Sequence, residues 1–179
     1  MKKFILVFVL YICFAVPIRA EVIYVDKNMN DGFWSGSYTD LQEAIQTANS
    51  GDEIWVAVGT YHPGADRSDS FVLKPGVKIY GGFYGGEVSR EDRDTYKNAT
   101  VLSGDIGLSG DPSDNSYHVI TYNGILDQQT LIDGFTIRDG NADNGEGGGG
   151  MYLINGAEPL IRNCRFSNNQ STTGGERYF

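Results

Sequence analysis

The stretch LIDGFTIRDG, residues 131–140, returns as LIRNCRFSNN, residues 160–169, and this internal repeat is the most informative feature of the sequence. The two copies are offset by 29 residues and place apolar side chains at equivalent positions, and each copy leads into a glycine-rich segment (145–150 or 174–175). A fixed offset of this size is typical of stacked architectures, in which one unit buries its apolar face only against the next. The repeat therefore predicts a solenoid.

The residues between the turns indicate which kind of solenoid to expect. Short runs rich in β-branched and aromatic residues alternate with Gly and Asn, which is typical of short strands joined by turns. Leucine-rich repeats need a Leu and Asn scaffold and helical repeats need paired amphipathic helices, and the sequence has neither. We therefore expect an all-β chain folded as a parallel β-helix. The expected strands lie within residues 54–58, 71–73, 77–80, 100–102, 117–120 and 131–137.

Asparagine is expected at the corners of this stack. Its backbone tolerates the left-handed conformation, and its amide can pair with the equivalent residue of the next coil. Asn163, Asn168 and Asn169 lie between and after the strands of the second copy. We interpret all three as corner and ladder residues.

One segment, residues 39–51, has helical periodicity instead. Its apolar residues fall at i, i+3, i+4 and i+7 and form one face of a short helix: Leu41, Ala44, Ile45 and Ala48. Thr39 is the expected amino-terminal cap, and Gly51 the expected carboxyl-terminal stop. Because a single helix ahead of many strands must bury its apolar face, we expect it to cap the open end of the stack.

The first twenty residues have the layout of a secretory signal peptide. Lys2 and Lys3 precede an apolar run over residues 4–16, and a short break ends at Ala20, where cleavage is expected. A membrane anchor is the alternative, but this run is shorter than the roughly 20 apolar residues that span a bilayer. We expect an exported protein, secreted or at the cell surface, without a transmembrane span in the mature chain.

The mature chain, residues 21–179, has the length of one domain, with a capping region at about 21–53 and coils at about 54–179. The signal segment contains three of the 14 basic residues, which leaves 11 against 23 acidic ones, a net charge near −12. Phosphate binding needs clustered Lys and Arg, so the composition excludes nucleic acid as a partner. Cys164 is the single mature cysteine, and we interpret it as a small core residue.

Several segments resemble the amino-terminal part of bacterial surface and secreted proteins with the pectin-lyase-like right-handed parallel β-helix. These segments are residues 23–26, 40–44, 51–57, 59–61, 76–83, 102–106, 133–137 and 148–152. GGGM at 148–151 and FSNN at 166–169 also look like the repeats of polymorphic outer-membrane proteins. The resemblance covers essentially the whole mature chain, and it implies a right-handed, single-stranded β-helix, with outer-membrane association as one location. Similar proteins usually continue through more coils, so we interpret this chain, with its incomplete last coil, as truncated.

The densest acidic loop is the candidate for metal binding. Asp105, Asp111, Asp114 and Asn115 offer oxygen ligands of the kind that Ca²⁺ prefers. The loop lacks the glycine spacing of an EF-hand, and its Pro-Ser pair is also typical of an ordinary turn. Both interpretations stay open, and we expect no other cofactor.

Enzymes of the pectin-lyase-like family that the sequence resembles cleave acidic polysaccharides. A lyase needs carboxylates that hold Ca²⁺ and a basic Arg or Lys, whereas a hydrolase needs two carboxylates about 5 to 9 Å apart. The sequence contains no compact cluster of either kind, and we assign no catalytic residue. The expected function is a non-catalytic, extracellular or cell-surface scaffold for adhesion, in contact with polysaccharide or a host or cell-surface glycan. A polysaccharide lyase or glycoside hydrolase is the alternative, because active sites on this fold assemble from separate coils.

Overall fold

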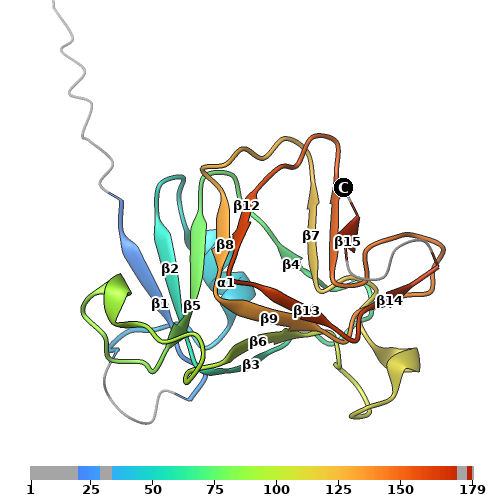
Figure 1. Cartoon of the computed structure of the whole chain (residues 1–179), viewed down its shortest axis with the longest axis horizontal. Coiled ribbons are helices and arrows are strands. Elements are labelled where there is room, and N and C mark those ends of the chain that lie inside the picture. The colour runs from blue at the N-terminus through green and yellow to red at the C-terminus, as the bar shows by residue number, and fades with distance from the viewer. Residues whose placement is uncertain (1–19, 29–33, 173–176, 179) are drawn as a thin grey trace, which may run out of the picture.

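The described part of the chain consists mainly of short strands in parallel sheets, with one α-helix (Figure 1). The structure is a computed structural model that describes residues 20–28, 34–172 and 177–178. Apart from Ala20, the predicted signal peptide lies outside the described residues. The expectation of an all-β chain with parallel pairing is confirmed at this level.

Three parallel sheets lie around a common interior (Figure 1). Sheet 1 has the strand order β1 (Val22–Val25), β2 (Glu53–Ala57), β5 (Lys78–Phe83), β8 (Leu131–Asp133) and β12 (Leu160–Arg162). Sheet 2 contains β3 (Gly59–Tyr61), β6 (Thr100–Ser103), β9 (Phe135–Arg138) and β13 (Arg165–Ser167). Sheet 3 contains β4 (Phe71–Val72), β7 (Ile120–Asn123), β11 (Met151–Ile154) and β15 (Arg177–Tyr178). A further pair is formed by β10 (Asn141–Ala142) and β14 (Gln170–Ser171).

The chain visits the three sheets in a repeating order. From β2 onward its strands enter sheet 1, then sheet 2, then sheet 3, and each new circuit pairs in parallel with the one before. The register of this pairing has the same 29-residue offset as the sequence repeat, since Leu160 lies opposite Leu131 and Phe166 opposite Ile137. The predicted repeat is therefore confirmed as the unit that pairs β12 with β8 and β13 with β9.

One circuit is longer than the next because it carries two insertions. Lys78 and its partner Leu131 are 53 positions apart, whereas 29 positions separate Leu131 from Leu160. Residues 84–99 include the 3₁₀ turn η1 (Arg90–Asp92), and residues 104–119 include η2 (Pro112–Asp114). The second insertion contains the acidic loop that the sequence analysis singled out. Because Ser116 and Tyr117 bond to Gly104 and Arg67, the strand expected at 117–120 begins only at Ile120.

The interior is filled by apolar side chains from all three sheets. In β9, Phe135 and Ile137 are buried, whereas Thr136 and Arg138, which follow them, are half-exposed, which is the alternation of a strand with one face on a core. Ile132 of sheet 1 and Ile120 of sheet 3 lie in the same cluster. Burial of each such side chain stabilises the fold by about 1.5–3 kcal/mol.

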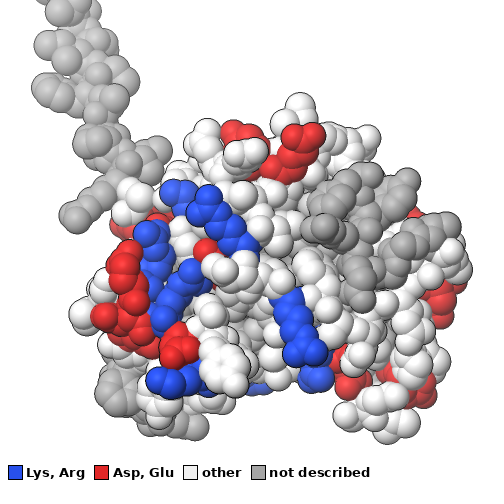
Figure 2. All heavy atoms as spheres, in the orientation of Figure 1, with Lys and Arg blue, Asp and Glu red and all other residues white. Residues whose placement is uncertain are grey.

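A second, aromatic cluster covers the outer face of sheet 1. The ring of Trp55 stacks on Phe83 with centroids 4.8 Å apart, and Trp34 donates its indole N–H to the carbonyl of Glu87 in the first insertion. Around this cluster basic and acidic side chains lie side by side, as Figure 2 shows, and Arg90 pairs with Glu53 at 2.8 Å. The exterior of sheet 1 is thus a packed and paired surface.

Helix α1 (Leu41–Thr47) is shorter than the periodicity predicted, and both predicted caps were wrong. Asp40, one residue after Thr39, is the cap, because its carboxylate accepts the free N–H of Glu43 at 2.9 Å. The carboxyl-terminal cap is Ala48, and Gly51, with φ of 101°, lies instead in the turn before β2. The predicted apolar face is confirmed by the burial of Leu41, Ala44, Ile45 and Ala48.

The helix packs against β1, β2 and β4. Strand β1 precedes it and already forms the edge of sheet 1, so the predicted capping region contributes a strand as well as a helix. In the part of the chain that the structure describes, no helix has the length and apolar character needed to cross a bilayer.

The predicted corner asparagines are confirmed. Asn163 and Asn168 have φ of 48° and 57°, in the left-handed region. Their amides reach back one circuit, Asn163 Nδ2 to Asp133 Oδ1 at 2.8 Å and Asn168 Nδ2 to Asp139 Oδ1 at 3.4 Å. Asn169 Oδ1 accepts the N–H of the residue 29 positions earlier at 3.0 Å. These bonds link equivalent corners of neighbouring circuits.

Candidate functional site

A groove of about 380 Å³ runs over sheet 3 across three successive circuits. Val72 of β4 lies opposite Thr121 of β7, which in turn lies opposite Tyr152 of β11. The next outward position pairs Asn123 with Ile154. Beside them on the same strands, Phe71, Ile120, Met151 and Leu153 are buried, so alternation along each strand places these side chains in rows on the outer face. The groove is lined by Val72, Thr121, Tyr122, Asn123, Glu146, Tyr152 and Ile154.

Glu146 enters this groove from the loop between β10 and β11 and is held there by His118. The His118 Nε2 atom lies 3.1 Å from Glu146 Oε2, and Nδ1 lies 3.1 Å from the carbonyl oxygen of Gly148. The imidazole also stacks on Tyr152, with centroids 4.6 Å apart. Both ring nitrogens of His118 therefore lie at hydrogen-bonding distance from an oxygen atom.

The same contacts set the charge at the groove. The hydrogen bond from His118, with a second from Asn144 Nδ2 at 2.8 Å, holds the pKa of Glu146 below its usual value. The carboxylate is therefore ionised at neutral pH and remains 48% exposed. No local sequence signal indicates this contact, because His118 and Glu146 are 28 positions apart and no spacing rule joins them.

This groove combines apolar and polar side chains. It offers apolar contact at Val72 and Ile154, and hydrogen-bonding groups at Thr121, Asn123 and Glu146. Of the residues that line it in the described part of the chain, Glu146 is the one carboxylate. The arrangement can accept and donate hydrogen bonds along an extended, partly apolar strip.

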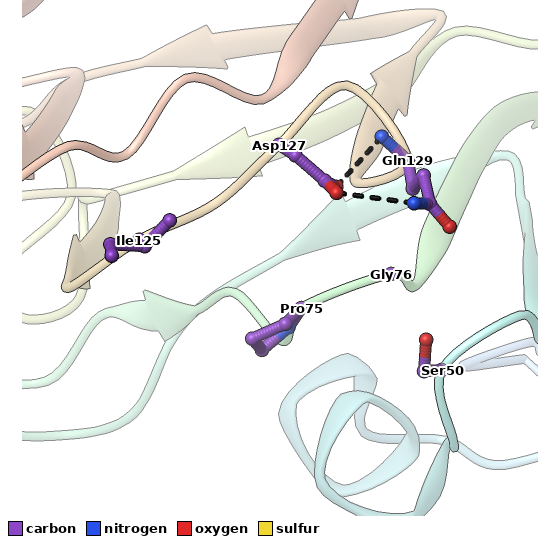
Figure 3. Close-up of a pocket in the computed structure, with 6 residues that line it drawn as sticks. All are labelled: Ser50, Pro75, Gly76, Ile125, Asp127 and Gln129. Atoms are coloured by element: carbon purple, nitrogen blue, oxygen red, sulfur yellow. Dashed lines mark hydrogen bonds between the residues drawn. The ribbon is translucent and has the colours of Figure 1, made fainter.

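A smaller hollow of about 200 Å³ lies at the corners that precede sheet 1 (Figure 3). In Figure 3 Asp127 points toward Gln129, and it accepts hydrogen bonds from the Gln129 backbone N–H at 3.0 Å and from Nε2 at 3.2 Å. Gly76 has φ of 72°, in the left-handed region that favours glycine, and a Cβ there would meet the Ser50 side chain. The carboxylate of this hollow is thus already engaged within its own turn.

The acidic loop places the four predicted Ca²⁺ residues in two different settings. Asp111 caps η2 and accepts hydrogen bonds from Ser113 N at 2.9 Å and Oγ at 2.7 Å, and Asp114 Oδ2 accepts the N–H of Leu108 at 2.6 Å. Those two residues serve the local turns. Asp105 also accepts a local N–H, that of Gly110 at 3.2 Å, and together with Asn115 it lines a hollow of about 270 Å³. The other residues that line this hollow are Gly110, Pro112, Asp139, Asn168 and Gln170.

The four residues therefore do not converge on one point. Within the ranges that the structure describes, no three His, Cys, Asp or Glu side chains gather in a way that could hold a metal ion. Sequence reasoning missed three residues that line the 270 Å³ hollow: Asp139, Asn168 and Gln170. They belong to corners of later circuits. The equivalence of Asp139 and Asn168 in the 29-residue repeat was the signal that could have found this hollow.

The fold and the sites together define a parallel-sheet protein with polar grooves on its surface. Residues 25–176 match the model of a family described as "Protein of unknown function (DUF1565)". This match spans most of the chain, so the chain belongs to that family. Searches among curated proteins and among solved structures gave no match.

Proposed function

We propose that this chain is a right-handed parallel β-helix that acts as a non-catalytic, extracellular or cell-surface scaffold and contacts carbohydrate through the groove over sheet 3. The repeated order of sheets 1, 2 and 3 supports this architecture, and parallel strands are joined by right-handed connections almost without exception. The segments that resemble pectin-lyase-like surface proteins support the same conclusion.

The proposed architecture includes an end cap. Strand β1 is the edge of sheet 1 and β4 is the edge of sheet 3, and α1 packs against both. A helix in that position shields the first circuit, whose unpaired backbone groups would otherwise recruit another chain. The capping role of α1 is thus part of the proposal.

The observation that carries the carbohydrate proposal is the alignment of groove residues across β4, β7 and β11. Equivalent positions on stacked strands lie about 4.8 Å apart, so Val72, Thr121 and Tyr152 form a regular row. A polysaccharide repeats along its length in the same way, and a row of this kind meets it at several points. The expected ligand is a polysaccharide or a host or cell-surface glycan.

A polysaccharide lyase or hydrolase is the competing function. A hydrolase requires two carboxylates on opposite sides of the scissile bond, and a lyase a basic residue beside the uronate. The described residues that line the groove include Glu146 as their one carboxylate and neither Lys nor Arg. This composition supports binding without turnover.

The expected location rests on the signal-peptide layout of residues 1–20. Export would place this acidic scaffold outside the cytoplasm, in the medium or at the cell surface, with the outer membrane as one attachment point. Detection of the protein in the culture medium or on intact cells, and its absence there when residues 1–20 are deleted, is the expected result.

The proposal is tested by screening the purified mature chain against a glycan array and against soluble polysaccharides, with turnover followed as release of reducing or unsaturated sugars. We expect binding without release. Glu146→Gln and Asn123→Ala should each weaken binding at least about fivefold, because each removes a hydrogen-bonding group worth about 1 kcal/mol. Glu158→Gln, which removes an exposed carboxylate outside the groove, is the matched control. Sugar release would establish the enzymatic function instead, and binding unaffected by either groove variant would place the contact elsewhere.

A further inference from the structure

Glu146, the carboxylate that lines the groove over sheet 3, is held through one of its two oxygen atoms. His118 Nε2 lies 3.1 Å from Oε2, and Asn144 Nδ2 donates to the same atom at 2.8 Å. The Glu146 backbone N–H also donates to Asn144 Oδ1 at 3.2 Å. Among the described residues, no donor bonds to Oε1. The carboxylate is therefore fixed in direction and keeps one oxygen for a ligand.

The imidazole that holds Glu146 is itself fixed. The His118 side chain is only 9% exposed, its Nδ1 lies 3.1 Å from the carbonyl oxygen of Gly148, and its ring stacks on Tyr152. The Glu146 side chain, by contrast, is 48% exposed and lines the groove. An exposed carboxylate on a buried support loses little side-chain freedom when a ligand binds, which favours affinity.

Lysine and arginine side chains do not balance this charge within the groove. Of the described residues that line it, none is Lys or Arg. The cations on neighbouring segments are engaged elsewhere, since Lys74 donates to the Gln46 carbonyl at 2.7 Å and Arg67 pairs with Asp143 at 2.8 Å. The whole chain has a net charge of −9. The groove therefore favours a cationic ligand over an anionic one.

The groove also offers a neutral hydrogen-bond donor at Asn123. Its Oδ1 accepts the side-chain amide of Asn155 at 2.7 Å, which leaves Nδ2 without a partner among the described residues. Thr121, in contrast, already shares a 2.6 Å hydrogen bond with Ser70 Oγ. Glu146 Oε1 and Asn123 Nδ2 thus present a ligand with one charged acceptor and one neutral donor.

We infer that the groove takes a polysaccharide that carries free amino groups, with an ammonium on Glu146 Oε1 and a sugar oxygen on Asn123 Nδ2. This assignment rests on the proposed function and names its substrate class. An ammonium on a carboxylate makes a charge-assisted hydrogen bond, about twice as strong as a neutral one. A uronate would instead bring a second negative charge beside Glu146, which is unfavourable. The groove should therefore select amino sugars and reject acidic ones.

The test compares soluble oligosaccharides of equal length by calorimetric titration of the mature chain near neutral pH. The oligomers are those of glucosamine, N-acetylglucosamine and galacturonic acid. We expect the glucosamine oligomer to bind at least about fivefold more tightly than its acetylated form, because acetylation removes the positive charge. The galacturonate oligomer should bind most weakly. Sodium chloride at about 0.5 M should remove most of the preference, because salt screens an exposed ion pair.

Two groove variants separate the charge from the rest of the contact. Glu146→Gln should lower affinity for the glucosamine oligomer at least about fivefold and change affinity for the acetylated form less than about twofold, since only the charged ligand loses an ion pair. Asn123→Ala should weaken both by a similar factor, because its donor meets an oxygen that both sugars have. Glu158→Gln, outside the groove, should keep the preference. Circular dichroism checks that each variant folds, and the comparison of oligomers on the original chain needs no variant.

The outcomes distinguish this assignment from the carbohydrate proposal. Equal or tighter binding of the acetylated or the galacturonate oligomer overturns the amino-sugar class and leaves carbohydrate binding in place. A lysine oligomer that binds as tightly as the glucosamine oligomer would show that charge alone is recognised, which overturns both. If the folded chain binds none of the oligosaccharides, the amino-sugar assignment fails, and the glycan array decides separately on carbohydrate binding.

Discussion

The Arg93 Nη2 atom lies 3.0 Å from Asp133 Oδ1, and this ion pair ties the first insertion to strand β8. The side chains are only 15% and 7% exposed, so the pair is largely removed from water. Arg93 Nη1 also donates to the carbonyl of Gly81 at 3.1 Å, and Asp133 accepts the Asn163 amide from the next circuit. One carboxylate thus connects an insertion, a strand and a corner of the stack.

Replacement of Arg93 should therefore be costly. Arg93→Met keeps much of the side-chain volume but leaves Asp133 buried without its cation, and we expect a loss of about 3 kcal/mol or more in the free energy of unfolding. Urea unfolding followed by circular dichroism measures this loss. The matched control is Lys97→Met, which removes a 3.4 Å pair with Asp94 where the lysine is 79% exposed, and it should cost less than about 1 kcal/mol. Equal costs for the two variants would contradict the role given to the Arg93 pair.

The cap of helix α1 offers a second test, because sequence and structure indicate different residues. Asp40→Ala removes the acceptor of the Glu43 N–H and should lower stability by about 0.5–2 kcal/mol. Thr39→Ala should leave stability nearly unchanged, since Thr39 is not the observed cap. The same urea experiment decides between them, and a larger effect at Thr39 would favour the cap predicted from the sequence.

Stability should fall in acid partly through Glu146. Its folded pKa is lowered by the hydrogen bond from His118, so its contribution to stability is complete above the unfolded pKa of about 4.5 and is lost as the pH falls through the folded value. Glu146→Gln should remove this component, so the difference in melting temperature between the original chain and the variant should shrink as the pH is lowered from about 6 to 3. A difference that stays constant over that interval would show that the carboxylate contributes nothing that depends on its ionisation.

Cys164 should react slowly with thiol reagents. Burial is the main cause that raises the pKa of its thiol, and its Sγ lies 3.7 Å from the carbonyl oxygen of Ile132. Since the thiolate is the reactive form, we expect labelling by a chromogenic disulfide at pH 8 to be at least about tenfold slower in the native chain than in denaturant. Labelling at the denatured rate would mean that the last circuit opens readily. The packing of Cys164 against the core agrees with its interpretation as a small core residue.

Features that depend on residues close together in the sequence were predictable from the sequence alone. The 29-residue offset became the register between β8 and β12, and the left-handed asparagines appeared at Asn163 and Asn168. The apolar face of α1 was also correct, because periodicity alone determines which side of a helix can be buried. The ends of that helix were missed, since a cap depends on one hydrogen bond that periodicity does not specify.

The candidate sites depended on contacts that no local pattern contains. His118 meets Glu146 across 28 positions, and Asp105 comes near Asp139 through Ser103, because each new circuit returns the chain to the same place on the stack. The sequence determined that the chain would stack and which residues would turn its corners, since these follow from alternation, periodicity and backbone preference. Only the tertiary structure decided which carboxylates gather and which remain in their own turns, because the two insertions set where distant loops meet.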